Sequence, residues 1–188
     1  MKTTLRSLAG LAFALAFAAT SMSPAVAATA GSGAAATPAT ALVTIESGAS
    51  SSRKCIGLAN NGSIANGTRL VLWDCHGGAD QTWYFENRFG RIDLRSGVPG
   101  YGISGKCVGT ANSGSTANGT ELVIWDCHGG ADQNWAWATF ADGSVELYNV
   151  PSSKCAGLAN SGSTTNGTRL VVWDCHAHPD QHWWLNAR

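Results

Sequence analysis

Residues 55–75 read CIGLANNGSIANGTRLVLWDC, and the same 21-residue pattern returns at residues 107–127 and 155–175. Each copy opens and closes with Cys, carries Asn-Gly-Thr in its middle and is followed by a Gln-x-Trp motif. The copies begin 52 and 48 residues apart, so the connecting segments vary in length while the repeated block does not. Repetition at this spacing indicates one supersecondary unit used three times. The sequence therefore predicts a fold with threefold internal repetition.

Each block has the pattern of strands joined by turns. In the first copy, Asn66-Gly67 is a strong short turn signal, for which we expect type I′ geometry. The segment that follows, residues 68–73, is rich in β-branched and aromatic residues, and its alternation separates Leu70 and Leu72 on one face from Trp73 on the other. Helical periodicity is absent, so we expect an all-β protein. Asn-Gly-Thr also matches an N-glycosylation acceptor, but the turn explains the same residues without a modification.

Six of the eight tryptophans fall into two groups, one residue of each group per repeat. Those of Gln-x-Trp are expected to meet in the core: Trp83, Trp135 and Trp183. Those two residues before the second Cys of each block should lie on the outer face: Trp73, Trp125 and Trp173. An outer Trp can stack on the apolar face of a ligand, or it can merely cover its own disulfide, and the residues leave both interpretations open.

All six cysteines lie within the repeats, two in each. Disulfides persist in oxidising compartments, and threefold repetition favours the symmetric pairing: Cys55 with Cys75, Cys107 with Cys127, and Cys155 with Cys175. A zinc site is the alternative, because a His follows the second Cys of each block. However, neighbouring Cys and His side chains point apart on a strand, and the chain has no Cys-x-x-Cys pair. We therefore expect three disulfides, no metal and no other cofactor.

The first residues are typical of an export signal. Lys2 and Arg6 precede an apolar run over residues 8–19, and small residues suited to cleavage follow at 25–27. This is the layout of a secretory signal peptide over residues 1–27. The apolar run is shorter than the roughly 20 residues needed to span a bilayer, although a retained anchor is the alternative interpretation. We expect a secreted, extracellular protein.

Downstream of the signal, residues 28–40 consist mainly of Ala, Thr, Gly and Ser and should form a flexible leader. Residues 41–188 suffice for one domain, with repeats at about 41–88, 89–140 and 141–188. Loss of two basic residues with the signal leaves 10 of the 12 Lys and Arg against 12 acidic residues, a formal charge near −2. Such a chain offers no basic surface, so we expect neither nucleic acid nor a membrane as a partner.

Taken together, the blocks Cys-x-Gly, Asn-Gly-Thr and Trp-Asp-Cys-His with Asp-Gln-x-Trp resemble the ricin-type β-trefoil lectins. That group includes the family 13 carbohydrate-binding modules of secreted bacterial glycosidases. The resemblance covers about residues 41–188. It implies twelve strands, four per repeat, as a six-stranded barrel closed by three hairpins. It also implies glycan binding without catalysis, through up to three shallow pockets. Separately, we expect a monomer.

The resemblance also identifies site residues. In that family an aromatic two residues before the second Cys stacks on the sugar, and the Gln of Gln-x-Trp and, in some bacterial modules, the His after the second Cys contribute. The matching residues are Trp73, His76 and Gln81 in the first repeat, Trp125, His128 and Gln133 in the second, and Trp173, His176 and Gln181 in the third.

Two departures from the family pattern concern the pocket. The family's Asp two residues after the first Cys is here Gly57, Gly109 and Gly157, and its outward polar residue is Val71, Val123 and Val171. A charge-assisted hydrogen bond is commonly worth about 1.5–3 kcal/mol. Losing such a hydrogen bond is a large change, because a site with millimolar affinity has a total binding free energy of only roughly 4 kcal/mol.

Another carboxylate stands where the family usually has Asn, directly before each Gln-x-Trp: Asp80, Asp132 and Asp180. We expect a rearranged pocket in which this Asp binds vicinal sugar hydroxyls beside the Trp ring. Three further residues are possible second contacts: Asn60, Asn112 and Asn160. The alternative is that each Asp only caps its turn. The third repeat has Ala177-His178-Pro179 where the others have Gly-Gly-Ala, so its pocket rim should be stiffer.

We therefore interpret the chain as a non-catalytic carbohydrate-binding module. A trefoil that has lost sugar binding and serves as a protein-interaction or inhibitory scaffold is the alternative. An enzyme is a third class, but the chain has no nucleophile motif such as Gly-x-Ser-x-Gly. Residues repeated three times also do not build a single asymmetric active site.

Overall fold

The computed structural model of the protein describes residues 42–88, 91–97 and 105–188. The expected signal peptide and leader, residues 1–27 and 28–40, lie outside the described residues. In the described part of the chain, no helix combines the length and the apolar character that crossing a membrane requires.

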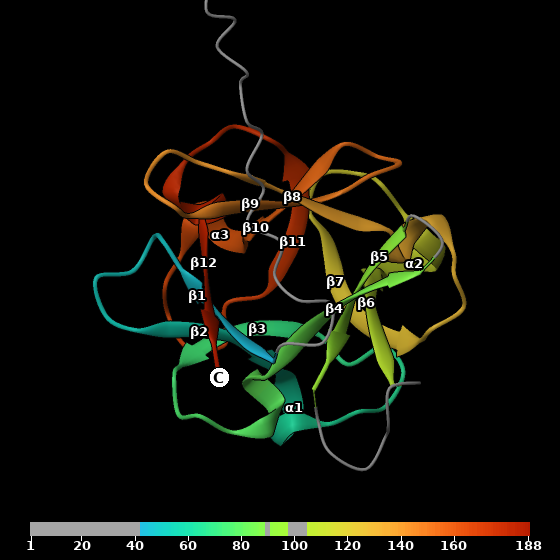
Figure 1. The fold of residues 1–188 in the computed structure, drawn as a ribbon, viewed down its shortest axis with the longest axis horizontal. Helices are drawn as coiled ribbons and strands as arrows, with labels where there is room; N and C mark the ends of the chain where they lie inside the picture. The colour runs from blue at the N-terminus through green and yellow to red at the C-terminus, as the bar shows by residue number, and fades with distance from the viewer. Residues whose placement is uncertain (1–41, 89–90, 98–104) are drawn as a thin grey trace, which may run out of the picture. The chain divides into compact units, whose positions relative to one another are not determined.

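The described residues form twelve β-strands, four from each repeat (Figure 1). The first repeat contains β1 (Val43–Ser47), β2 (Lys54–Leu58), β3 (Leu70–Asp74) and β4 (Trp83–Arg88); the second β5 (Arg91–Ser96), β6 (Lys106–Thr110), β7 (Thr120–Asp126) and β8 (Trp135–Thr139); the third β9 (Val145–Asn149), β10 (Lys154–Leu158), β11 (Leu170–Asp174) and β12 (Trp183–Ala187). The short helical turns are α1 (Ala59–Gly62), α2 (Ala111–Gly114), α3 (Ala159–Gly162) and the 3-10 turns η1 (Ala79–Gln81), η2 (Ala131–Gln133) and η3 (Pro179–Gln181).

Six of the strands close into a barrel. Each of β1, β4, β5, β8, β9 and β12 pairs antiparallel with two others of the set, so the ring is complete. The pair β1–β12 runs from Val43 opposite Ala187 to Ser47 opposite Trp183, which fastens the two ends of the domain together. A closed ring leaves none of these strands as a free edge.

The other six strands form three hairpins: β2–β3, β6–β7 and β10–β11. Their second strands pair with one another around the pseudo-threefold axis, through Val171 and Glu121 and through bridges from Arg69 to Val123 and from Val71 to Arg169. A six-stranded barrel closed by three hairpins is a β-trefoil. The expectations of an all-β trefoil with twelve strands are confirmed.

The tryptophans of Gln-x-Trp fill the centre of the domain. Trp83, Trp135 and Trp183 are at most 1% exposed and belong to a single cluster of buried residues. Each indole N–H must find an acceptor when it is buried. The three Nε1–H groups donate to the backbone carbonyls of Ile56, Val108 and Ala156, at 2.9, 2.9 and 3.1 Å. The prediction that these rings form the core is confirmed.

Strand alternation separates the core from the outer face, as predicted. On β3, Leu70 and Leu72 are buried in the core cluster, whereas Trp73 is 45% exposed. Val71 is 8% exposed but does not belong to the core cluster, because it lies on the same face as the Trp. The second strand of each hairpin therefore presents a Trp ring to solvent: Trp73, Trp125 and Trp173.

The predicted turn at Asn66-Gly67 is present, but its type I′ geometry was wrong. The N–H of Thr68 donates to the carbonyl of Ala65 at 3.0 Å, which closes the turn. Of the two central residues only Gly67 has a positive φ, 85°. Type I′ requires positive φ at both, and this pattern matches type II. Long-range contacts of the Asn66 side chain account for the difference.

That side chain binds the next repeat. Asn66 Nδ2 donates to Asp126 Oδ2 at 2.7 Å, and its Oδ1 accepts from the Asp126 N–H at 2.9 Å and from Lys106 Nζ at 2.7 Å. Equivalent bonds join Asn118 to Asp174 and Asn166 to Asp74. We call these three contacts the inter-repeat clamps. They use both ends of each amide, which favours the structural explanation of Asn-Gly-Thr over glycosylation.

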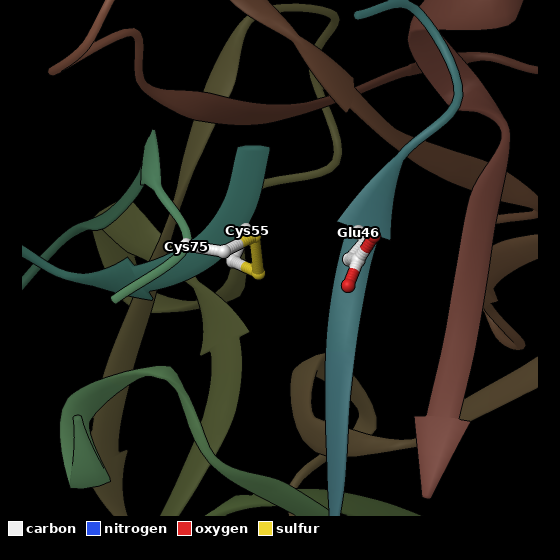
Figure 2. A group of neighbouring side chains, drawn as sticks. All are labelled: Glu46, Cys55 and Cys75. Carbon is white, nitrogen blue, oxygen red and sulfur yellow. A yellow bond between two sulfur atoms is a disulfide. The ribbon is translucent and has the colours of Figure 1, made fainter. Parts of the chain in front are cut away.

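The three predicted disulfides are present, one in each repeat, with Cα atoms 5.0 Å apart. Each joins the start of a hairpin's first strand to the residue after its second strand. Figure 2 shows Cys55 bonded to Cys75 beside Glu46 of β1. Because every cysteine is paired, none offers a thiolate to a metal, which removes the basis of the Cys–His zinc alternative.

Candidate functional site

Each repeat carries a pocket on the face of its hairpin opposite the core. The pocket volumes are about 430 Å³ in the first repeat, 650 Å³ in the second and 500 Å³ in the third. Small-molecule sites occupy roughly 300–1,000 Å³. Ten equivalent positions line all three pockets, and in the first repeat six of them are Gly57, Asn60, Val71, Trp73, His76 and Asp80. Trp, His and Asp are thus brought together as the sequence predicted.

The exposed ring of each pocket is backed by a neighbouring repeat. Trp73, Trp125 and Trp173 are 45%, 46% and 44% exposed. A Cβ placed on Gly167 would lie 3.7 Å from Cζ3 of Trp73, so the Asn-Gly turn of the third repeat borders the first pocket. Trp73 stands opposite Cys55 in the hairpin register, yet nearly half of its surface remains open. Covering the disulfide therefore does not account for the whole ring.

The carboxylate of each pocket occupies the space above a glycine. A Cβ on Gly57 would lie 3.5 Å from Asp80 Oδ2 and 3.1 Å from Gln81 Cγ. In the second repeat the corresponding Cβ would lie only 2.6 Å from Asp132 Oδ2, closer than atoms can pack. In the second repeat the glycine therefore leaves room for the carboxylate that enters from the 3-10 turn, whereas in the first repeat a Cβ and the carboxylate would be in ordinary contact. Each pocket therefore has an acidic group, although the strand position beside it is a glycine.

A histidine faces this carboxylate in every repeat. The Nδ1 atom of His76 accepts from the N–H of Gly78 at 3.1 Å, so the neutral ring carries its proton on Nε2. Nε2 lies 3.5 Å from Asp80 Oδ2, and the matching distances are 3.8 and 3.7 Å in the second and third repeats. These distances exceed an ordinary hydrogen bond. The Nε2–H donor of the histidine and the carboxylate acceptor therefore lie side by side, and both remain able to hydrogen-bond to a ligand.

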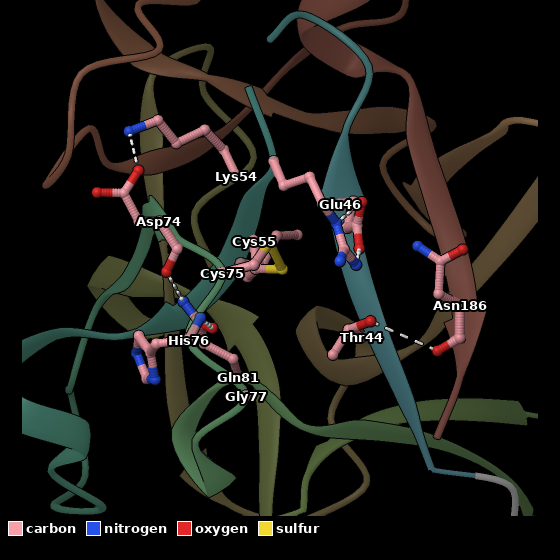
Figure 3. Close-up of a disulfide and its surroundings, with 12 residues drawn as sticks. Thr44, Glu46, Lys54, Cys55, Asp74, Cys75, His76, Gly77, Gln81 and Asn186 are labelled. Atoms are coloured by element: carbon pink, nitrogen blue, oxygen red, sulfur yellow. Dashed lines mark hydrogen bonds and ion pairs between the residues drawn. A yellow bond between two sulfur atoms is a disulfide. The ribbon is translucent and has the colours of Figure 1, made fainter. Parts of the chain in front are cut away.

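The glutamine of Gln-x-Trp lies beneath the pocket and does not line it. Gln81 is fully buried. Its Oε1 accepts from the N–H of His76 and its Nε2 donates to the carbonyl of Asp74, both at 2.9 Å (Figure 3). Gln133 and Gln181 make the same bonds. With both ends of the amide engaged, the glutamine positions the histidine, and the structure does not bring it to the pocket surface.

The polar rim on the other side comes from the turn after the first hairpin strand. Asn60 and Asn61 both have the left-handed conformation, with φ of 54°. Asn tolerates this region better than other non-glycine residues, but Ser113 and Ser161 adopt it at the equivalent of position 61. Such strain is maintained only where the surrounding structure enforces it. This left-handed turn places Asn60, Asn112 and Asn160 at the pocket wall.

The inter-repeat clamps adjoin the pockets, since Asp74 follows the exposed Trp directly. Lys54 Nζ donates to Asp74 Oδ1 at 2.6 Å, as Figure 3 shows, and Asn166 Nδ2 donates to Oδ2 at 2.7 Å. The hydrogen bond from Lys54 and then that from Asn166 hold the pKa of Asp74 below its ordinary value. The same causes lower the pKa of Asp126 and of Asp174. These carboxylates fix the strand beneath the ring.

One charged cluster near the pseudo-threefold axis was missed in the sequence. Glu121 accepts from Arg69 Nε at 2.5 Å and also pairs with Arg169. Burial alone would raise the pKa of Glu121, but the hydrogen bonds and charges of the two arginines outweigh it and lower the pKa. The three residues occupy equivalent positions of the repeats. Arg69 and Glu121 line the second pocket and Arg169 the third, which makes the pockets unequal.

A Ser–Asp–His group in the third repeat bears on the enzyme alternative. Ser144 Oγ donates to Asp142 Oδ1 at 2.6 Å and lies 3.5 Å from His182 Nδ1. In a nucleophilic triad the His stands between Ser and the carboxylate. Here the Ser stands between them, its proton faces the carboxylate, and it is only 1% exposed. This group does not present an activated nucleophile to a substrate.

Comparisons with known proteins agree with the repeat pattern. Residues 41–183 match the family model described as the ricin-type beta-trefoil lectin domain. Volkensin from Adenia volkensii is 33% identical over 82 residues, which is 44% of this chain and 13% of volkensin. The chain thus matches only a small part of that relative's length.

Solved structures share the fold. The designed 3-fold symmetric protein ThreeFoil superposes with a TM-score of 0.68 at 23% identity, over 77% of this chain and 97% of ThreeFoil. The Macrolepiota procera ricin B-like lectin, solved in complex with lactose, gives a TM-score of 0.62 at 20% identity, over 78% of this chain and 95% of that lectin. At such identities the likeness establishes the fold alone.

Proposed function

Because this chain belongs to the ricin-type beta-trefoil lectin family, we propose that it binds carbohydrate through three pockets, one in each repeat, and catalyses no reaction. One observation carries the proposal: an exposed Trp ring and a carboxylate share a concave pocket, and the arrangement occurs three times. An aromatic face and a hydrogen-bond acceptor are the two surfaces that a sugar ring needs, since one side of the ring is apolar and its edge carries hydroxyls.

The first pocket illustrates the mode of binding. The apolar face of a sugar stacks on Trp73, while two vicinal hydroxyls donate to the Asp80 carboxylate. The Nε2–H of His76 then donates to a hydroxyl oxygen, and the Asn60 amide contacts the opposite edge. These groups lie on two segments of one repeat, and the disulfide and the Gln81 bonds hold the His-bearing segment in place. The site is formed before the ligand arrives, which limits the entropy lost on binding.

The charges of the pocket favour a neutral glycan. Asp80 is an acceptor when ionised, so it pairs with hydroxyl donors and repels carboxylate or sulfate groups of acidic sugars. In the second pocket the positive charge of Arg69 is matched by Glu121. We therefore expect uncharged hexoses or pentoses with vicinal hydroxyls to bind more tightly than uronic acids.

Three similar pockets suit a repeating polymer. A single shallow site of this kind binds weakly, in the range of about 1 mM or −4 kcal/mol. Simultaneous use of two or three sites raises the avidity by roughly 10²–10⁴ where the geometry permits. The export signal expected at residues 1–27 and the three disulfides fit a protein that meets such polymers outside the cell.

Binding of the purified protein to a panel of polysaccharides and arrayed glycans tests the proposal. The matched variant carries Trp73→Ala, Trp125→Ala and Trp173→Ala, which removes the stacking surface but no core residue. We expect neutral polysaccharide to bind the protein and not the variant, with both giving the same circular dichroism spectrum. Absence of binding by the intact protein across the panel would refute the proposal and direct attention to a protein partner.

A further inference from the structure

The third pocket contains one metal-binding side chain that the other two lack. His178 replaces the glycine found at Gly78 and Gly130, and its ring is exposed. It packs edge-on against His176, with ring centroids 4.8 Å apart. Asp180 completes a group of two imidazoles and one carboxylate whose ligand atoms all lie within 4.8 Å of one another. The first and second repeats have only the His–Asp pair at this place.

We propose that His176, His178 and Asp180 bind one divalent transition-metal ion, for which zinc is the natural candidate. Imidazole nitrogen suits zinc, copper and nickel, whereas calcium and magnesium prefer an all-oxygen set. Two His and one carboxylate are also a known zinc ligand set, in which water or a substrate takes the fourth position. The site was not expected from the sequence, where zinc was considered only with the cysteines. It goes beyond the proposed function, because the ion needs no glycan to bind.

The backbone brings the two imidazoles to the same side. Ala177, between them, has a φ of 54°, the left-handed conformation that Gly77 and Gly129 adopt in the other repeats. The N–H of His178 donates to Nδ1 of His176 at 3.3 Å, which leaves Nε2 of His176 for a metal. That Nε2 atom lies 3.7 Å from Asp180 Oδ2. Two ligand atoms that each lie about 2.0–2.1 Å from one ion are at most about 4 Å apart. Small side-chain rotations therefore complete the site.

Rigid neighbours hold this segment on both sides. Cys175, directly before His176, is fixed by its disulfide to Cys155. Pro179, directly after His178, opens the turn η3 and restricts its own φ. Both constraints reduce the freedom that the ligands lose when an ion binds. The first and second repeats have Ala where the third has Pro179.

Two other groups of potential ligands occur among the described residues, and both lack a free sulfur. They combine Glu46 with Cys55 and Cys75 (Figure 2), and Glu146 with Cys155 and Cys175. In each, the two sulfurs are bonded to one another, and a disulfide sulfur is not the thiolate that binds metals. Within the described part of the chain, the third pocket is therefore the site with a suitable donor set.

The ion would make the third pocket different in function from the other two. It would engage Asp180, the carboxylate that the proposed function assigns to sugar hydroxyls, and it would sit in the pocket lined by Trp173. Its open coordination position could then take a glycan hydroxyl directly. Zinc should change sugar binding at the third pocket and leave the first and second unaffected.

Calorimetric titration of zinc into the metal-free protein, without sugar and without any histidine tag, tests the proposal. We expect one ion per chain. His178→Gly, which restores the residue of the other repeats, should weaken binding at least as much as the roughly 10–100-fold typical of losing an outer-shell partner. Asp180→Asn should weaken it as well. No binding by the protein, or binding of unchanged affinity in His178→Gly, would overturn the proposal whether or not the protein binds glycans.

A transfer of the site provides the reciprocal test. The first repeat with Gly77→Ala, Gly78→His and Ala79→Pro carries the same ligand sequence as the third, and His76 and Asp80 are already present. A Cβ at residue 78 would meet the ends of the His76 and Asp80 side chains, so both must rotate to admit the new histidine. We expect this variant to bind a second zinc ion with an affinity within tenfold of the first. A folded variant that still binds one ion would show that the three ligands are insufficient and would overturn the proposal.

Discussion

Asp132 and Gly109 occupy one another's space: a Cβ at residue 109 would lie 2.6 Å from Asp132 Oδ2. The corresponding distances are 3.5 Å from Asp80 Oδ2 to a Cβ at Gly57, and 3.6 Å from Asp180 Oδ2 to one at Gly157. In the second repeat the glycine of the strand therefore leaves space for the Asp of the 3-10 turn, whereas in the first and third repeats a Cβ would meet the carboxylate at an ordinary contact distance. In every repeat the carboxylate of the pocket comes from the 3-10 turn and not from the hairpin strand.

Neutralising that carboxylate should weaken glycan binding. Asp80→Asn, Asp132→Asn and Asp180→Asn together remove a charge-assisted acceptor from every pocket. A hydrogen bond to a charged group is worth about 1.5–3 kcal/mol, so we expect each pocket to lose roughly tenfold or more in affinity. Isothermal titration with the preferred glycan measures the loss, and circular dichroism verifies the fold. Unchanged affinity in a folded variant would mean that these residues only cap their turns.

The space above the glycine should matter most in the second pocket. Gly109→Ala places a methyl group 2.6 Å from Asp132 Oδ2 and must displace the carboxylate, whereas Gly57→Ala meets Asp80 Oδ2 at 3.5 Å. Each change is measured with the Trp of the other two pockets replaced by Ala, so that one pocket remains. We expect Gly109→Ala to reduce affinity more than Gly57→Ala does. An equal loss of affinity in the two variants would indicate that the carboxylate does not contact the bound glycan.

Breaking one inter-repeat clamp should destabilise the domain. Asn66→Ala removes the bonds to Asp126 and Lys106 and leaves their partners to water. Asn66→Asp is harsher, because it places a second carboxylate at hydrogen-bonding distance from Asp126. We expect the urea midpoint to fall in the order intact protein, Asn66→Ala, Asn66→Asp. A midpoint for Asn66→Asp at or above that of Asn66→Ala would contradict the role given to this amide.

Acid should weaken the clamps. The hydrogen bonds from Lys and Asn lower the pKa of Asp74, Asp126 and Asp174 in the folded protein. A carboxylate with a lowered folded pKa stabilises the protein above its unfolded pKa of about 3.9, and this contribution is lost as pH falls through the folded value. The melting temperature should therefore decline below about pH 4. Replacing all three Asp by Asn should flatten that decline, and an unaltered decline would count against this account.

Each disulfide should contribute substantially to stability. The paired cysteines are 20 residues apart, and closing a loop of that length is worth about 3 kcal/mol in the chain-entropy model. Cys55→Ala with Cys75→Ala should reduce the free energy of unfolding in guanidinium by about that amount. The equivalent pair in the second repeat, Cys107 and Cys127, provides a matched comparison and should give a similar loss. A loss well under 1 kcal/mol in both would show that the hairpins are held without their bridges.

The features that the sequence predicted correctly depend on local periodicity and on repetition. Alternation along β3 was enough to separate Leu72 from Trp73, and the threefold symmetry of the cysteines was enough to pair them. The predicted type of the turn at Asn66 was wrong for the opposite reason. The geometry of this turn depends on Asp126, a residue of another repeat. Contacts between distant segments leave no trace in a local pattern.

The arrangement of side chains around the candidate pocket was predicted in part. Trp, His and Asp were expected to come together, and they do, whereas Gln81 lies beneath the pocket because its amide serves the backbone. The cluster of Arg69, Glu121 and Arg169 was not predicted, because the motifs were defined by the positions that are identical in all three repeats and this position changes charge. A change of charge sign at one position of a repeat was the available signal. It indicates that three copies of this position meet, where three like charges would repel.

The inter-repeat clamps have a direction, because every repeat gives an amide to one neighbour and receives one from the other. This head-to-tail relation is the kind that closes identical subunits into rings, and here it closes after three steps within one polypeptide. The number of repeats that surround the axis is therefore fixed by the geometry of the fold. Trp73, Trp125 and Trp173 each lie beside the Asn-Gly turn of an adjacent repeat, so deleting one repeat would remove one pocket and open the wall of a second.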